Sequence, residues 1–266
     1  MRTLVEKLRR KVFWTFGQPL TRRPEQVGDP VSDLFVWRNS EDWKTFFELI
    51  DIAGLFDGDE SVSGRSATIL FFDNNGEQFL EQRFDLLSNE RQTIDLTEFV
   101  TESESSSGTF CIFHTTPQVV SDLGSFIAER GYVSYKYKEA PLRSYVHGNF
   151  DAISLSRNKE LRLLCSSSFF PREYRLQHEL SGSALYEVVI VNPSSRDQIV
   201  TCQVLCICNG ASMGVQEVRL RPRASHVFFV QVETVQPVRV VINSHLIMAR
   251  PLVFRIHQQK MVAFYG

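Results

Sequence analysis

From about residue 67 onward, short apolar runs alternate with polar turns, a pattern typical of β-strands joined by tight connections. Candidate strands in the first half are Asp33–Arg38, Ala67–Phe72, Gln78–Phe84, Gln92–Phe99, Thr109–His114, Tyr132–Lys138 and Arg143–Asn149. Those in the second half are Leu161–Ser166, Tyr174–Leu180, Leu185–Val191, Ile199–Cys208, Val215–Leu220, His226–Val232, Val238–Asn243, Leu252–His257 and Val262–Tyr265. Strands at this spacing predict antiparallel β-sandwiches.

Three segments have helical spacing instead. Leu4–Phe16 has apolar positions on one face and basic residues between them, which predicts a short basic amphipathic helix. Trp43–Ile50 carries apolar residues at positions i, i+3, i+4 and i+7, the spacing of one helical face. A third helix is expected between the N-cap candidate Thr116 and the stop signal Gly131.

These elements predict a mainly β protein with a few short helices, organised as two antiparallel sandwich-like domains. Residues 1–30 are the helix and a Pro-containing linker, residues 31–157 an N-terminal β-rich domain with two helices, and residues 158–266 a C-terminal β-sandwich. The halves share a rhythm of strands and turns, in which Ala67–Phe72 corresponds to Leu185–Val191. A divergent internal duplication would explain this rhythm. Two unrelated β domains or one long sandwich are the alternatives.

The second half contains a strand, an Asn-Pro-Ser turn, a further strand and a Leu-x-Pro turn. The segments concerned are Val188–Ser195 and Val218–Ser225, within about 50 residues. This order resembles, in general style, immunoglobulin-like sandwich modules of bacterial proteins. The resemblance implies an immunoglobulin-like fold and no activity, and the Cys–Trp–Cys core of antibody-type domains is missing.

Composition places the chain among ordinary globular proteins, since 43% of its 266 residues are hydrophobic and 23% are charged. The net charge of −2 hides three blocks: residues 1–30 carry +4, residues 31–107 carry −12 and residues 108–266 carry +6. The blocks either neutralise one another within the fold or present the acidic block to a cationic partner. Basic residues form no stripe interleaved with aromatics, so no nucleic-acid partner is predicted.

No apolar run reaches the roughly 18–20 residues that span a bilayer, and the N-terminus lacks the pattern of a secretory signal. The expected location is therefore cytoplasmic, with peripheral membrane contact through the N-terminal helix as an alternative. The five cysteines include no C-x-x-C pair and are interpreted as buried small hydrophobes in a reducing compartment. No metal or other cofactor is predicted.

One sequence motif of catalysis occurs, the G-x-S-x-G of Gly210–Gly214. A nucleophile elbow needs a helix after the serine, whereas Val215–Leu220 alternates like a strand. We therefore interpret this motif as a glycine-rich hairpin loop, and no catalytic residue is predicted.

The most site-like segment gathers five polar or aromatic residues within nine positions. They are Arg143, Tyr145, His147, Asn149 and Asp151. The first four share one parity, so a strand would place them on one face, where Tyr145 could stack on a ligand and Arg143 and Asn149 could form hydrogen bonds. The alternative is an ordinary half-exposed outer face of a sheet.

Taken together, these patterns predict a non-enzymatic β-sandwich binding or protein-interaction protein of unknown ligand, with a protein or a glycan as the possible partner. The alternative is a carbohydrate-active enzyme, or an accessory protein of glycan metabolism, with a site near residues 143–151. Geometry distinguishes them: a concave pocket that collects His147, Asn149 and Asp151 favours the enzyme, and a flat exposed face favours interaction.

Overall fold

The structure is a computed structural model of the chain, and it describes residues 22–52, 54, 65–87, 90–101, 103–148, 150–233, 236–247, 251–257 and 260–265. Strands dominate these residues, which confirms the prediction of a mainly β fold. The elements of helix type that they form are the α-helix α3 (Gln118–Asp122) and the 3-10 helix η1 (Leu96–Glu98). The predicted N-terminal helix lies outside the described residues.

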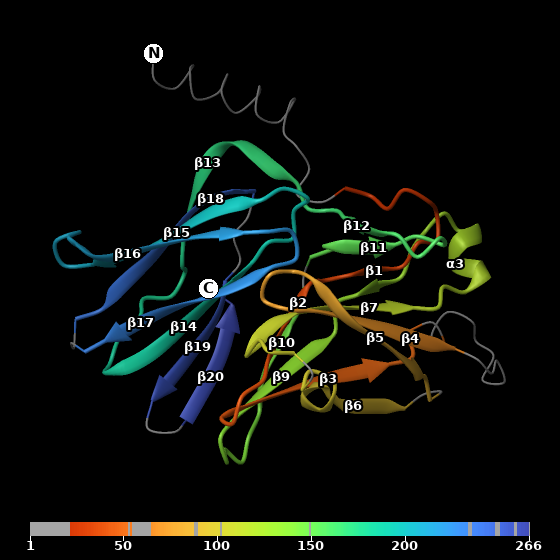
Figure 1. Cartoon of the computed structure of the whole chain (residues 1–266), viewed down its shortest axis with the longest axis horizontal. Helices are drawn as coiled ribbons and strands as arrows, with labels where there is room; N and C mark the ends of the chain where they lie inside the picture. The colour runs from red at the N-terminus through yellow and green to blue at the C-terminus, as the bar shows by residue number, and fades with distance from the viewer. Residues whose placement is uncertain are drawn as a thin grey trace.

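The strands of the described residues form five four-stranded sheets (Figure 1). Sheet 1 is β2 (Phe35–Arg38), β7 (Ser107–His114), β4 (Ser66–Phe72) and β5 (Gln78–Asp85) in order of pairing. Sheet 2 is β10 (Ser144–His147), β9 (Tyr132–Tyr137), β3 (Trp43–Ile50) and β6 (Arg91–Asp95). Sheet 3 is β13 (Ser167–Arg175), β18 (Val238–Leu246), β15 (Gln198–Cys206) and β16 (Ser212–Leu220). Sheet 4 is β17 (Ser225–Val232), β14 (Ala184–Val191), β19 (Leu252–His257) and β20 (Lys260–Tyr265). Sheet 5 is β12 (Leu161–Leu163), β11 (Ile153–Leu155), β1 (Val31–Ser32) and β8 (Ala128–Glu129).

Five sheets of four strands match the number and size of the blades of a five-bladed β-propeller. They do not match the two sandwich domains that the sequence predicts, and neither the two-domain division nor the immunoglobulin-like resemblance is supported. The chain also enters each sheet out of order, as in β13-β18-β15-β16, so no sheet consists of four consecutive strands. Alternation along a strand indicates that one face is buried, but it does not specify which other strands lie beside it, and this is why the prediction was wrong.

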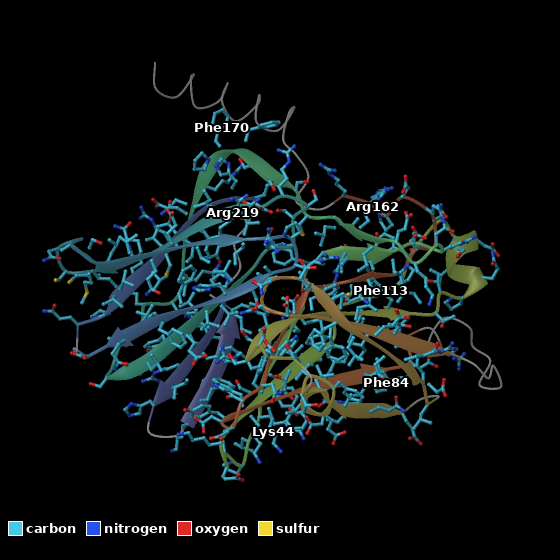
Figure 2. All side chains as sticks on the ribbon, in the orientation of Figure 1. Lys44, Phe84, Phe113, Arg162, Phe170 and Arg219 are labelled. Carbon is cyan, nitrogen blue, oxygen red and sulfur yellow. The ribbon has the colours of Figure 1, made fainter. Side chains whose placement is uncertain are left out.

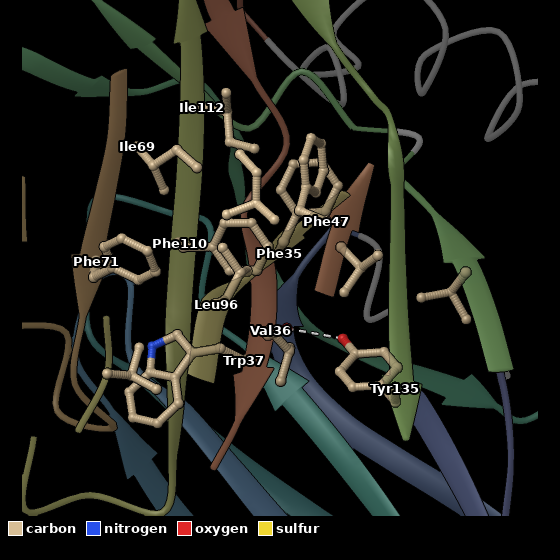
Figure 3. Packing of buried hydrophobic residues seen from close by; sticks show 14 of the residues in the cluster. Phe35, Val36, Trp37, Phe47, Ile69, Phe71, Leu96, Phe110, Ile112 and Tyr135 are labelled. Atoms are coloured by element: carbon tan, nitrogen blue, oxygen red, sulfur yellow. Dashed lines mark hydrogen bonds between the residues drawn. The ribbon is translucent and has the colours of Figure 1, made fainter. Parts of the chain in front are cut away.

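The largest hydrophobic core draws on both sides of residue 157. Side chains of sheets 1 and 2, aliphatic and aromatic, make up most of it, and the Tyr135 hydroxyl donates a hydrogen bond of 2.8 Å to the carbonyl of Val36 (Figure 3). Sheet 4 adds Val189, Leu252, Phe254 and Ala263, which are buried on the face that does not pack against sheet 3. The Phe254 ring lies 4.8 Å from both Trp43 and Tyr135, centroid to centroid. A second core lies between sheets 3 and 4, and a third packs sheet 5 against sheet 1.

The same pairing scheme occurs twice in the chain. If β2–β7, β9 and β10 are matched in order with β13–β20, every antiparallel ladder in sheets 1 and 2 has a counterpart in sheets 3 and 4. The β4–β5 and β15–β16 hairpins both contain Asn-Gly with the glycine at positive φ, +83° for Gly76 and +70° for Gly210. The sequence pattern matches the β14 segment with Ala67–Phe72, which lies in β4. The pairing scheme instead matches β14 with β3, one strand earlier in the chain.

The shift arises because Trp43–Ile50, predicted as a helix, is the strand β3. Phe47 and Leu49 point into the main core, whereas Phe46 and Ile50 lie on the opposite face of sheet 2. Apolar residues on both faces of a strand can reproduce the i, i+3, i+4, i+7 spacing of a helix. The helix expected before Gly131 is also wrong in extent, since α3 ends at Asp122 and Ala128–Glu129 forms β8.

Candidate binding face

The predicted site residues of β10 lie at the edge of sheet 2. Tyr145 and His147 are exposed on either side of the buried Val146, as strand alternation requires. Arg143 immediately precedes the strand, and its guanidinium stacks 3.6 Å above the ring centroid of Phe46. The structure therefore brings Arg143, Tyr145 and His147 to one face, which we call the β10 face: the outward-facing side chains of β10, β9, β3 and β6.

Strand register sets the neighbours across this face. Thr93 on β6 pairs with Glu48 on β3, Glu48 pairs with Tyr132 on β9, and Tyr132 pairs with His147 on β10. These four side chains form one row perpendicular to the strands, with Tyr132 52% exposed and its ring 6.1 Å from that of His147. Tyr145, 47% exposed, occupies the adjacent row opposite Ser134. The two tyrosines thus present neighbouring aromatic surface to solvent.

Glu48 is the electrostatic centre of the β10 face. It is only 4% exposed, and its Oε2 accepts hydrogen bonds of 2.8 Å from Arg91 Nε and Thr93 Oγ1. Arg143 Nη1 lies 3.8 Å from its Oε1. The hydrogen bond to Glu48 raises the pKa of Arg91 further above its ordinary value. A nearly buried carboxylate therefore orients two guanidinium groups, and Arg91 stays exposed at the surface.

Asp151 does not belong to the β10 face. Its Oδ1 accepts hydrogen bonds from Arg130, at 2.9 Å from Nε and 2.6 Å from Nη2. Asn149 lies outside the described residues. His147 Nδ1 is 2.9 Å from the carbonyl oxygen of Gly148, a contact within the strand end. Three of the five predicted residues are thus brought together.

The described part of the chain gathers no group of three or more His, Cys, Asp or Glu side chains with the geometry of a metal site. A small pocket with Asp33, Phe150, Val189 and Tyr265 in its lining lies between sheet 4 and the N-terminal half, and its lining includes neither Tyr145 nor His147.

Three contributors to the β10 face were not anticipated: Glu48, Arg91 and Tyr132. Glu48 lies within the segment predicted as a helix, and Tyr132 and Arg91 lie outside the segment that was predicted as the site. A single glutamate inside an otherwise apolar and aromatic run is the signal that could have identified the first of them, because a carboxylate is rarely buried without cationic partners.

The G-x-S-x-G motif is a hairpin, as predicted. Ser212 is the first residue of β16, and β16 pairs with β15 over its length. A strand and not a helix follows the serine, so the geometry of a nucleophile elbow does not occur there.

Comparisons with known proteins give no family assignment. No family model matches the chain, and no curated protein matches it. Two solved structures of infectious bursal disease virus are similar at low level: the Gx strain at 11% identity and a TM-score of 0.20, and the Gt strain at 12% and 0.17. The chain is covered to 81% and 89%, and it spans just over half of those chains, 56% and 55%. Likenesses with TM-scores this low support no argument about function.

Within the described ranges, none of the helices has the length and apolar character that crossing a bilayer requires.

Proposed function

We propose that this protein is a non-enzymatic interaction protein that binds an acidic segment of a protein partner on its β10 face. The observation that carries the proposal is the exposed cluster of Arg91, Arg143, Tyr132 and Tyr145 on a regular sheet. Tyr and Arg are the residue types enriched at the energetic centres of protein interfaces. The cluster is also preorganised, since Glu48 and Phe46 hold the Arg143 side chain in place.

The charge of the β10 face favours an acidic partner. Lys44 and Lys136 pair across β3 and β9 and add two cations to Arg91 and Arg143. Both carboxylates of the face are already engaged: Glu48 with the arginines, and Asp95 with the backbone N–H of Thr97 at 3.0 Å. An incoming carboxylate would therefore meet cations and few competing acids.

The internal repeat supports contact through this face. We infer that the two matched halves descend from one ancestral unit. In the β9–β10 hairpin, Tyr132 pairs with His147, and in the β19–β20 hairpin Leu252 pairs with Tyr265. Each pair joins the first residue of one strand to the last residue of the next, so Tyr132 corresponds to Leu252. In the second half, the equivalent face of sheet 4 is apolar and packs against the first half. In the first half the corresponding face is polar and aromatic, a composition suited to a reversible partner.

Single substitutions on the β10 face test the proposal. Arg143→Ala and Tyr145→Ala should each weaken binding of a fluorescein-labelled peptide rich in Glu and Asp by about fivefold or more, because each removes an anchor worth about 1–3 kcal/mol. Fluorescence anisotropy at low ionic strength measures the Kd. The free energy of unfolding should change by no more than about 1 kcal/mol, since half-exposed face residues contribute little to the core.

Arg219→Ala is the matched control. Arg219 is an exposed arginine on sheet 3, paired with Asp197 at 2.8 Å and distant from Lys44 of the β10 face (Figure 2). The control should bind the peptide like the wild-type protein. Equal Kd values for Arg143→Ala, Arg219→Ala and wild type, or no binding at all, would contradict the proposal. Retention on a glycan array that Tyr145→Ala abolishes, without peptide binding, would instead support the carbohydrate alternative.

A further inference from the structure

The β15–β16 hairpin carries a pair of cysteine thiols on sheet 3, a different sheet from the one that forms the β10 face. Cys206 is the last residue of β15, and Cys208 lies in the turn that follows it. Their Sγ atoms are 2.7 Å apart, and both cysteines are free. Cys208 is exposed and Cys206 is half-buried, so solvent reaches the pair.

The turn holds the two thiols together. Gly210 N donates to the carbonyl of Cys206 at 2.8 Å, and Cys206 N donates to the carbonyl of Ala211 at 2.8 Å. The Asn209 side chain accepts a hydrogen bond of 3.0 Å from Ala211 N, which fixes the conformation of the turn. The glycine at φ +70° allows this closure. The two sulfurs are therefore neighbours because of the backbone, and they need to approach only about 0.7 Å further to reach bonding distance.

The pair differs chemically from the other three cysteines. Cys111, Cys165 and Cys202 are buried, and burial raises the pKa of Cys165 and Cys202 to about 12. At Cys206 the hydrogen bond from the Cys208 thiol lowers the pKa instead. The thiolate is the reactive form of cysteine, so reactivity is concentrated at the hairpin. Gln236 Oε1 lies 3.8 Å from the Cys206 sulfur and 3.6 Å from the Cys208 sulfur.

We propose that Cys206 and Cys208 form a reversible dithiol–disulfide couple that exchanges with low-molecular-weight disulfides of the glutathione type. The Cys206 thiolate attacks one sulfur of oxidised glutathione, which forms a mixed disulfide and releases one glutathione thiolate. Cys208 loses its proton to solvent and attacks the Cys206 sulfur, which breaks the mixed disulfide and releases the second glutathione thiolate. The protein pair loses two electrons and oxidised glutathione gains them.

Mass spectrometry after thiol trapping tests the couple. The full chain is equilibrated with defined ratios of oxidised and reduced glutathione, quenched with N-ethylmaleimide and digested. The expected product is one intrachain disulfide between Cys206 and Cys208 that disappears as the ratio falls. Cys111, Cys165 and Cys202 should remain as thiols, and in the native protein they should be alkylated at least about tenfold more slowly than the hairpin pair.

Cys206→Ser and Cys208→Ser are the diagnostic variants. Each leaves one thiol that solvent reaches, so each should accumulate a stable glutathione adduct where the wild-type protein resolves to the disulfide. Unchanged thermal melts show that the variants are folded. The couple would be disproved if the wild-type protein also stopped at the glutathione adduct, if it linked two chains, or if the hairpin thiols stayed reduced. None of these results bears on peptide binding at the β10 face.

Discussion

Replacing Arg38 with methionine is expected to reduce the free energy of unfolding by about 3–5 kcal/mol at pH 7, the usual cost of leaving one charge of a buried pair unpaired. Arg38 on β2 and Glu187 on β14 form an ion pair of 2.8 Å, with side chains only 7% and 6% exposed. Methionine retains much of the arginine packing over Trp43, whose ring centroid lies 5.0 Å from the guanidinium. Chemical denaturation followed by circular dichroism measures the change.

The decrease in the free energy of unfolding caused by Arg38→Met should be smaller under acidic conditions. Burial raises the pKa of Glu187, and Arg38 opposes the shift, so the pKa rises further when Arg38 is replaced. When the pKa of a carboxyl is higher in the folded protein than in the unfolded chain, its protonation stabilises the fold. This contribution is complete below the unfolded pKa, near 4.5, and it is lost as the pH rises through the folded pKa. The Arg38→Met variant should therefore regain stability relative to wild type as the pH falls from 7 towards 4.5.

The double variant Arg38→Met with Glu187→Met is the control. It removes both charges, and replacement of a buried pair by apolar residues of similar volume is often neutral or stabilising. Its free energy of unfolding should lie close to that of the wild type. A single variant within about 1 kcal/mol of wild type at pH 7 would show that water reaches the pair and that the two halves do not enclose it.

Phe254→Ala is expected to cost about 3–5 kcal/mol, the range for removing a fully buried phenylalanine. Phe254 belongs to the second half, yet its ring packs on Trp43 and Tyr135 of the first half. Unfolding curves from tryptophan fluorescence and from far-ultraviolet circular dichroism should shift together, because one shared core predicts one cooperative transition.

Phe229→Ala provides the matched comparison. Phe229 lies on β17 in the same half, but 55% of it is exposed, so its truncation should change stability by less than about 1 kcal/mol. Two separate transitions in the Phe254→Ala variant, with the first half unaffected, would contradict the shared core.

The sequence predicted local features of the candidate site correctly. Alternation placed Arg143, Tyr145 and His147 on one parity of a strand, and the structure has them on one face. Alternation depends on the backbone geometry of consecutive residues, so it can be recognised within a short segment. Glu48 and Arg91 could not be added in the same way, because they reach this face through strands about 50 to 100 residues away, and register across strands is not encoded in any single segment.

The local predictions were wrong in segments whose burial is unusual. The strand β3 has apolar residues on both faces, since the main core covers one face and the Arg143 side chain covers Phe46 on the other. Local periodicity assumes one solvated face, and it fails where tertiary contacts cover both. The three cysteines of equal parity, Cys202, Cys206 and Cys208, illustrate the same limit: the first is buried, whereas the hairpin carries the other two beyond the core.

The sequence by itself thus determined the β character of the chain, the positions of most strands and the turns between them, because these follow from local backbone preference and the burial of one face. Only the tertiary structure decided which strands pair, how five sheets divide the cores, and that Arg38 meets Glu187 across the two halves. Those outcomes depend on which apolar faces and charges pack together between segments that are far apart in the chain. No local pattern connects such segments, so the sequence of one segment does not indicate its partner.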